Sequence, residues 1–134
     1  MRVVLDTNVW VSGIVFGGVP LRILEMALDS DFDLVVSADI INEVESVLRS
    51  KKFGYSANEI RDVVQPLLDV ADFVIPQNRV TEIKRCPADN RILECALEGK
   101  AEYIVTGDMR DLGKLGVFQG IKIISPRVFR NLFP

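Results

Sequence analysis

Hydrophobic residues in this chain occur in short apolar runs and in longer stretches with helical spacing. The short runs predict strands that are buried on both faces of a sheet. They cover residues 3–5, 34–36, 73–75, 103–105 and 121–124. Between them, apolar residues three and four positions apart predict amphipathic helices. Strands that alternate with helices favour parallel pairing through right-handed crossovers, so the predicted fold class is α/β with helices on both faces of the sheet.

Residues that cap or interrupt helices refine this prediction. Ser56 and Glu59 have the spacing of a capping box, and Pro66 is expected to kink or divide the helix that they open. A helix that begins near Pro87 is expected to end at Gly99, a residue suited to a helix C-terminus. Further helices are predicted around residues 9–15, 20–28, 40–48 and 127–132.

Length and hydropathy indicate one domain. The 134 residues, of which 49% are hydrophobic, suffice for a single core, and no repeat or linker divides the chain. We therefore predict one domain over residues 1–134. No apolar run approaches the ~20 residues that cross a membrane, and the first apolar run meets a charge at Asp6. The expected protein has no membrane segment and is cytoplasmic.

The sequence also restricts the available chemistry. It contains no histidine, so acid–base or metal chemistry must use carboxylates, hydroxyls, lysines or backbone groups. Its two cysteines, Cys86 and Cys95, cannot complete a tetrahedral zinc site on their own. We expect both to be reduced and partly buried, because a free cysteine behaves as a small hydrophobic residue.

Two acidic residues follow predicted strands. Asp6 comes directly after the first strand, and Asp108 follows the fourth strand after Thr106 and Gly107. Ligands of open α/β sheets bind beyond the carboxyl ends of the strands. A single acid after a strand is most often a turn former, but two acids at one edge of a sheet suggest a site.

Two further acids lie on predicted helices. Asp89 falls in the first turn of its helix, on the same side as the inward-facing Ile92 and Leu93. The alternative for Asp89 is an acid that only complements the helix dipole. Glu43 and Glu45 occupy opposite shoulders of their apolar stripe, so helical spacing does not choose between them, and a solvated surface glutamate is the ordinary interpretation of either.

A divalent cation would explain a cluster of acids. Unpaired carboxylates repel one another, whereas Mg²⁺ binds oxygen ligands and can activate water for phosphodiester hydrolysis. The net charge of −3 argues against a nucleic-acid partner. That objection weakens if four acids bind metal, because the remaining charges are then slightly positive.

Four segments together resemble a known family. They are Val4-Leu5-Asp6-Thr7-Asn8-Val9, Asn42-Glu43-Val44, the run from Asp89 to Ala96, and Tyr103-Ile104-Val105-Thr106-Gly107-Asp108. Their order and spacing resemble those of PIN-domain ribonucleases over nearly the whole chain. The resemblance is closest to the small prokaryotic, VapC-like toxin components of toxin–antitoxin pairs.

The resemblance implies a three-layer α/β/α fold with a five-stranded parallel sheet. It also implies a Mg²⁺- or Mn²⁺-dependent endoribonuclease, an RNA substrate, an antitoxin partner and frequent homodimers. It assigns four residues to the acidic, metal-binding site, and so selects Glu43 over Glu45. These residues are Asp6, Glu43, Asp89 and Asp108.

Other residues receive lesser roles from the resemblance. Asn8 and Thr106 would support the two strand-end aspartates through hydrogen bonds. Asp111 is either an extra acid near the metal or a helix-start residue. Five basic residues are either phosphate contacts or ordinary solvated charges. They are Lys51, Lys52, Arg91, Arg110 and Lys114.

Three alternatives compete with a ribonuclease. A phosphatase of the haloacid dehalogenase type would need a second acid two residues after Asp6, where this chain has Asn8. A receiver domain would need an acceptor acid after the third strand, which ends Val74-Ile75-Pro76. The third alternative is a non-catalytic PIN-like module that binds RNA or protein; RNA binding that persists in a chelator without cleavage would favour it.

Overall fold

A six-stranded sheet forms the centre of the structure, a computed structural model that describes residues 1–134. The strand order is β3-β2-β1-β4-β6-β5, and all neighbours are parallel except β5 and β6. The strands are β1 (Arg2–Leu5), β2 (Asp33–Val36), β3 (Asp72–Phe73), β4 (Tyr103–Val105), β5 (Val117–Phe118) and β6 (Ile121–Ile124). Each of the five predicted runs contributes a strand to the parallel part of the sheet, but the run at residues 73–75 contributes only Phe73. Both residues of β3 are exposed, so the prediction that this strand is buried was wrong.

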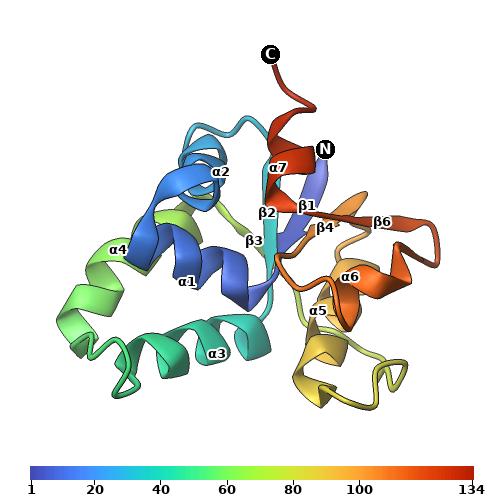
Figure 1. Ribbon diagram of the computed structural model, residues 1–134, viewed down its shortest axis with the longest axis horizontal. Helices are drawn as coiled ribbons and strands as arrows, with labels where there is room; N and C mark the ends of the chain where they lie inside the picture. The colour runs from blue at the N-terminus through green and yellow to red at the C-terminus, as the bar shows by residue number, and fades with distance from the viewer.

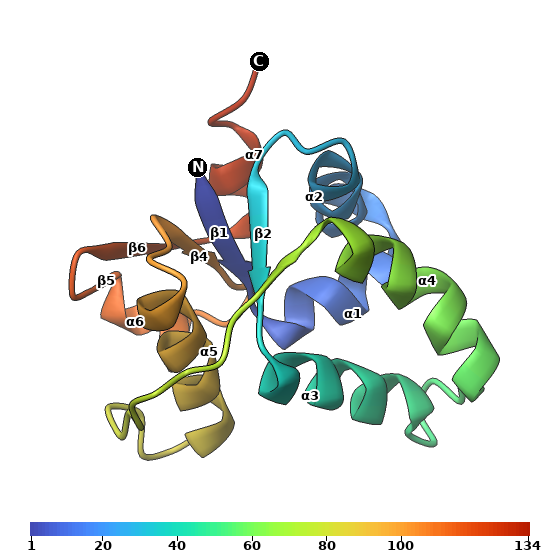
Figure 2. The same ribbon diagram turned by 180° about the vertical axis from the view of Figure 1, so that it is seen from behind.

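Helices cover the sheet on both faces, which confirms the predicted α/β fold. They are α1 (Thr7–Phe16), α2 (Gly18–Leu28), α3 (Ala38–Arg49), α4 (Ala57–Val70), α5 (Pro87–Glu98), α6 (Leu112–Leu115) and α7 (Pro126–Arg130). Figures 1 and 2 show α1 to α4 on one side of the sheet and α5 on the other. The core lies between these layers, where the central strands β1, β2 and β4 place fully buried side chains.

Close packing fixes α5 on the sheet. The helix ends at Gly99, as the sequence predicts. A Cβ atom at Gly99 would collide with the side chain of Val35 in β2. Glycine is therefore required here for a close approach between helix and sheet, and this approach sets the position of α5.

The sixth strand is a departure from the five-stranded prediction. Strand β5 has two residues and pairs with β6 through the two-residue turn Gln119-Gly120. Both turn residues have positive φ, 47° and 85°, as in the hairpin turns whose twist matches that of the strands. So short a strand leaves no hydrophobic periodicity in the sequence. The preceding four-residue helix α6 is equally short, and the sequence indicated it only through Asp111 as a possible helix-start residue.

Helix α4 is not divided at Pro66, which was one of the two outcomes predicted for this residue. It begins at the predicted capping box of Ser56 and Glu59 and continues to Val70. Pro66 removes the hydrogen bond to the carbonyl of Asp62, but both residues are exposed, so water can satisfy that carbonyl. Buried residues on both sides of the proline hold the helix against the core.

No single helix has the length and apolar composition to cross a membrane. Helices α1 and α2 pass that test only when taken together, and they are bent by 104° where they meet.

Candidate functional site

The sheet brings Asp6 and Asp108 to one edge. Strands β1 and β4 are parallel neighbours, with Leu5 paired to Val105. Asp6 is the residue after Leu5 and is the N-cap of α1. Asp108 follows three residues after Val105, so both carboxylates leave the carboxyl ends of adjacent strands, as the sequence predicts.

Asp6 is held by three hydrogen bonds. Its Oδ1 accepts from the backbone N–H of Thr7 at 2.7 Å, and its Oδ2 accepts from Thr106 Oγ1 at 2.7 Å and from Asn8 Nδ2 at 3.0 Å. The residue is only 5% exposed. Burial raises the pKa of Asp6 above its ordinary value, and these hydrogen bonds oppose part of that rise. The carboxylate is thus fixed in orientation.

Asn8 and Thr106 also connect Asp6 to the loop that carries Asp108. Asn8 Oδ1 accepts a hydrogen bond from the backbone N–H of Gly107 at 3.0 Å. Thr106 Oγ1 accepts one from the backbone N–H of Asp108 at 3.0 Å. Each of the two side chains therefore links the β1 end to the β4 end, and the two acidic residues are positioned as a unit.

Asp108 is the acid whose charged form is favoured. Partial burial raises its pKa, but hydrogen bonds from the backbone N–H groups of Arg110, Asp111 and Leu112, together with the charge of Arg110, outweigh burial and leave the pKa below its ordinary value. Its Oδ1 accepts from Arg110 N at 2.8 Å. Asp108 is consequently ionised at neutral pH.

Asp89 faces inward from the first turn of α5, as predicted. It is 9% exposed, and its Oδ2 is buried without a hydrogen-bond partner. Burial, followed by the charges of Asp6 and Asp108, raises the pKa of Asp89 to about 6. A buried carboxylate oxygen without a donor is costly unless a cation or water satisfies it.

The structure separates Glu43 from Glu45. Glu43 lines the same cleft as the three aspartates, and burial together with the charge of Asp6 raises its pKa. Glu45 lines a different groove, between α3 and α4, with Arg49 and Arg61. Only Glu43 is therefore in a position to act with Asp6.

These four acids surround one cleft of about 420 Å³, called here the acidic cleft. Its lining residues are Asp6, Thr7, Asn8, Val11, Ser12, Phe16, Glu43, Val47, Lys52, Phe53, Cys86, Asp89 and Asp108. Asp111 lies beside it: carboxylate oxygens of Asp89, Asp108 and Asp111 lie within 4.8 Å of one another, close enough to ligate one metal ion. Asp111 is the N-cap residue of α6, but its side chain makes no capping hydrogen bond.

The donor set fits a hard divalent cation. Carboxylate oxygens are the ligands that Mg²⁺ and Mn²⁺ prefer, and an acid cluster without a cation is destabilised by repulsion. The unpartnered Oδ2 of Asp89 is the atom in the cleft that most needs a positive partner. The charges of Asp6 and Asp108 act on Asp89, so the three carboxylates are close to one another and the residues present fit such an ion.

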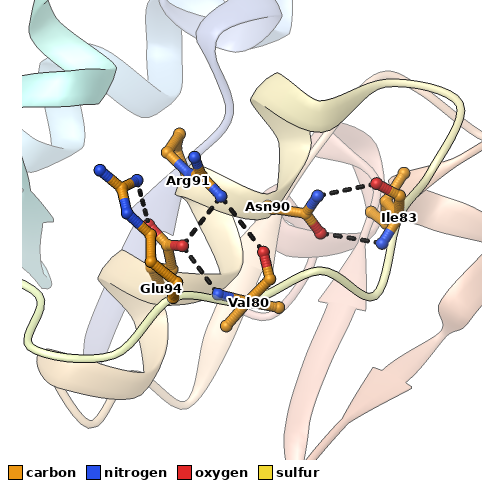
Figure 3. A network of polar contacts seen from close by, with 6 residues as sticks. Val80, Ile83, Asn90, Arg91 and Glu94 are labelled. Carbon is orange, nitrogen blue, oxygen red and sulfur yellow. Dashed lines mark hydrogen bonds and ion pairs between the residues drawn. The ribbon is translucent and has the colours of Figure 1, made fainter.

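Two polar residues of α5 that sequence reasoning left without a role fasten the preceding loop to the helix (Figure 3). The Asn90 side chain donates to Ile83 O at 2.7 Å and accepts from Ile83 N at 2.8 Å. Glu94, 3% exposed, pairs with Arg91 at 2.9 Å and accepts from Val80 N at 2.8 Å. Both are polar residues on the buried side of α5, and this is the feature of the sequence that could have indicated their structural role.

The basic residues named from the sequence differ in position. Lys52 lines the acidic cleft, and Arg110 lies next to Asp108 on the exposed surface. Arg91 is committed to Glu94 and to the carbonyl of Val80, so it is not free to contact phosphate. Lys51 and Lys114 are exposed and do not line the cleft.

Both cysteines are free, and one of them lines the cleft. Burial and the nearby charge of Asp89 raise the pKa of the Cys86 thiol. Cys95 is fully buried in α5, and burial raises its pKa to about 12. Neither thiol is poised as a nucleophile, which leaves the chemistry of the cleft to its carboxylates.

Comparisons with known proteins agree with this fold. The structure is similar to a chain in the crystal structure of VapBC2 from Rickettsia felis, which was solved bound to a DNA fragment from the VapBC2 promoter. The TM-score is 0.62 and the sequence identity is 14%. The match covers 93% of this chain and 98% of the other, and it supports the fold. No curated protein matches the sequence. The family profile of the PIN domain matches residues 2–110, so the chain belongs to the PIN-domain family.

Proposed function

We propose that this protein is a Mg²⁺- or Mn²⁺-dependent endoribonuclease, formed by one domain over residues 1–134. The observation that carries the proposal is the buried Asp89 carboxylate, which has an oxygen without a hydrogen-bond partner and lines a cleft with Asp6, Glu43 and Asp108. Membership of the PIN-domain family supports a nuclease, because nucleases are the general function of that family. The family and the donor chemistry of the cleft together favour metal-dependent phosphodiester hydrolysis.

The four acids divide two tasks in this proposal: binding the cation and activating the attacking water. Asp6, Asp89 and Asp108 would hold the cation, with Asp6 kept in orientation by Thr106 and its other hydrogen-bond donors. When bound, such an ion would neutralise charge on the phosphate and lower the pKa of water. Glu43, whose raised pKa makes it a better proton acceptor than an exposed glutamate, would orient the attacking water and accept its proton.

We further propose that the protein is the toxin of a toxin–antitoxin pair. The similar structure, VapBC2 of Rickettsia felis, supports this biological setting. The proposal includes a cytoplasmic location, a homodimer and an antitoxin as the protein partner. Co-expression with the product of a neighbouring gene, followed by co-purification and relief of growth inhibition, tests the partner independently of RNA cleavage.

Cleavage of mixed structured and single-stranded RNAs with Mg²⁺ or Mn²⁺ tests the activity. EDTA and Asp6→Asn should each abolish cleavage. Glu43→Gln and Glu45→Gln form a matched pair on one helix, since only Glu43 lines the cleft. We expect Glu43→Gln to lose most of the activity and Glu45→Gln to retain it. Full cleavage by Asp6→Asn would overturn the proposal, as would cleavage that persists in EDTA.

A further inference from the structure

The acidic cleft extends well beyond the carboxylates. Helices α1 and α3 pack side by side and run away from the sheet (Figure 1). Residues of both helices line the cleft, so the two helices form its walls. On α1 the lining residues Asn8, Ser12 and Phe16 lie one helical turn apart and form a single stripe. On α3 the lining residues Glu43 and Val47 have the same spacing. Both walls therefore lead from the acids toward an outer end.

Two phenylalanines form that outer end. Phe16 is the last residue of α1, and Phe53 lies in the turn after α3. Their rings meet edge to face, with centroids 6.1 Å apart and an interplanar angle of 73°. This contact orients the Phe16 ring but does not cover it, because Phe16 remains 73% exposed. An aromatic ring that is both oriented and exposed is available to stack on another flat group.

A positive charge accompanies the rings. The ammonium group of Lys52 lies 5.4 Å from the centroid of the Phe53 ring and lines the same cleft. Lys52 forms no ion pair, and Lys51 beside it is also exposed. The outer end thus combines an aromatic face with unpaired cations, which is the pairing that single-stranded nucleic acid uses for its bases and phosphates.

We propose that Phe16, supported by Phe53 and Lys52, stacks on an unpaired base of the substrate near the phosphate that is cleaved. The inference rests on the proposed ribonuclease function. Thr7 to Phe16 spans about 14 Å along α1, so a strand bound at the acids can reach the ring within a few nucleotides. The face of a base within a duplex is already covered by its neighbours, so the subsite selects single-stranded RNA.

Charge and position favour a nucleotide over an apolar protein segment. The rings are continuous with the acidic cleft, where a phosphate would bind, and the cation of Lys52 lies 5.4 Å from the Phe53 ring, with exposed Lys51 next to it in the chain. A purely apolar partner would leave these cations unused. A protein segment that covers Phe16 is therefore the competing occupant. The test separates the two, because stacking on a base requires an aromatic side chain at position 16, whereas an apolar contact does not.

Binding of a fluorescently labelled single-stranded RNA to the Asp6→Asn protein tests the subsite without cleavage. We expect Phe16→Ala and Phe16→Leu each to weaken binding about 5- to 150-fold, because stacking on one base is lost. Phe73→Ala is the matched control: Phe73 is 55% exposed on β3, away from the cleft. The fluorescence of a 2-aminopurine base in the oligonucleotide should be quenched by the protein that retains Phe16 and not by Phe16→Leu.

Several outcomes would overturn the subsite. They are the absence of binding to single-stranded RNA, full binding by Phe16→Ala, full binding by Phe16→Leu, or equal weakening by Phe73→Ala. Failure of the nuclease proposal would give a different result. The parent chain would then show no cleavage that depends on Asp6, whether or not RNA binding depends on Phe16. Cleavage that requires Asp6 but is unchanged in Phe16→Ala, with unchanged binding, would remove the subsite alone.

Discussion

The hydroxyl of Thr106 donates a 2.7 Å hydrogen bond to the carboxylate of Asp6, although the two residues are 100 positions apart in the chain. Thr106 is fully buried, and the same hydroxyl accepts the backbone N–H of Asp108. One side chain thus sets the orientation of one acid and the backbone path to another. The geometry of the acidic cleft depends on the pairing of β1 with β4.

Replacing Thr106 with valine tests this coupling, because valine keeps the shape and removes the hydroxyl. We expect the variant to lose about 1–3 kcal/mol of stability in urea unfolding, since a buried carboxylate and a backbone N–H lose a partner. The pKa of Asp6 should rise further, because the Thr106 hydrogen bond lowers it. The pH profile of cleavage should therefore shift upward. Thr81→Val, at an exposed loop position, should change neither property.

The raised pKa of Asp89 predicts a pH-dependent stability in metal-free protein. Its ordinary pKa is 3.8 and its folded pKa is about 6, so the folded state holds an extra proton between these values. Stability should consequently fall as the pH rises from about 4 through 6, by about 3 kcal/mol. Asp89→Asn should remove this fall and be more stable than the parent chain at pH 7.

Urea unfolding in EDTA between pH 4 and pH 8 measures the Asp89 effect. Asp31→Asn, at an exposed position outside the cleft, is the control and should keep the pH dependence of the parent chain. An Asp89→Asn protein with the same pH dependence as the parent would contradict the assignment of the raised pKa to this residue.

Divalent cations should stabilise the protein through the same acids. Mn²⁺ at 100 times its dissociation constant should add about 2.7 kcal/mol, because it binds the folded state. Asp6→Asn and Asp89→Asn should lose this rise in melting temperature, whereas Glu45→Gln should retain it because Glu45 lies outside the cleft. A rise of equal size in all four proteins would mean that the ion binds elsewhere.

Glu94 is expected to hold the loop before α5 in place. Glu94→Gln removes the charge that pairs with Arg91 and Arg79, and the predicted loss is about 1–3 kcal/mol. The backbone amide of Val80, which bonds to Glu94, should exchange with solvent faster. Hydrogen exchange measures this, with the exposed Glu82→Gln as control. Unchanged protection of Val80 would show that the loop is held by other contacts.

Much of the fold was determined by the sequence itself, because the relevant signals are local. A strand buried on both faces is apolar, so the buried parts of β1, β2 and β4 were visible as short apolar runs. Strand β3 is different, because both of its residues are exposed. The capping box of Ser56 and Glu59 acts within one helical turn and was likewise readable. The position of Asp89 on the inward side of α5 followed from helical periodicity.

Tertiary structure decided what local patterns leave open. Glu43 and Glu45 are equivalent by helical spacing, and only the packing of α1 and α4 on either side of α3 places one at the acids and the other in a separate groove. Likewise, Pro66 breaks a local rule, but packing on both sides of it keeps α4 continuous. The meeting of Phe16 with Phe53, and of Asp6 with Thr106, joins distant segments. Such contacts form only when the layers assemble, because no local energy in the chain specifies them.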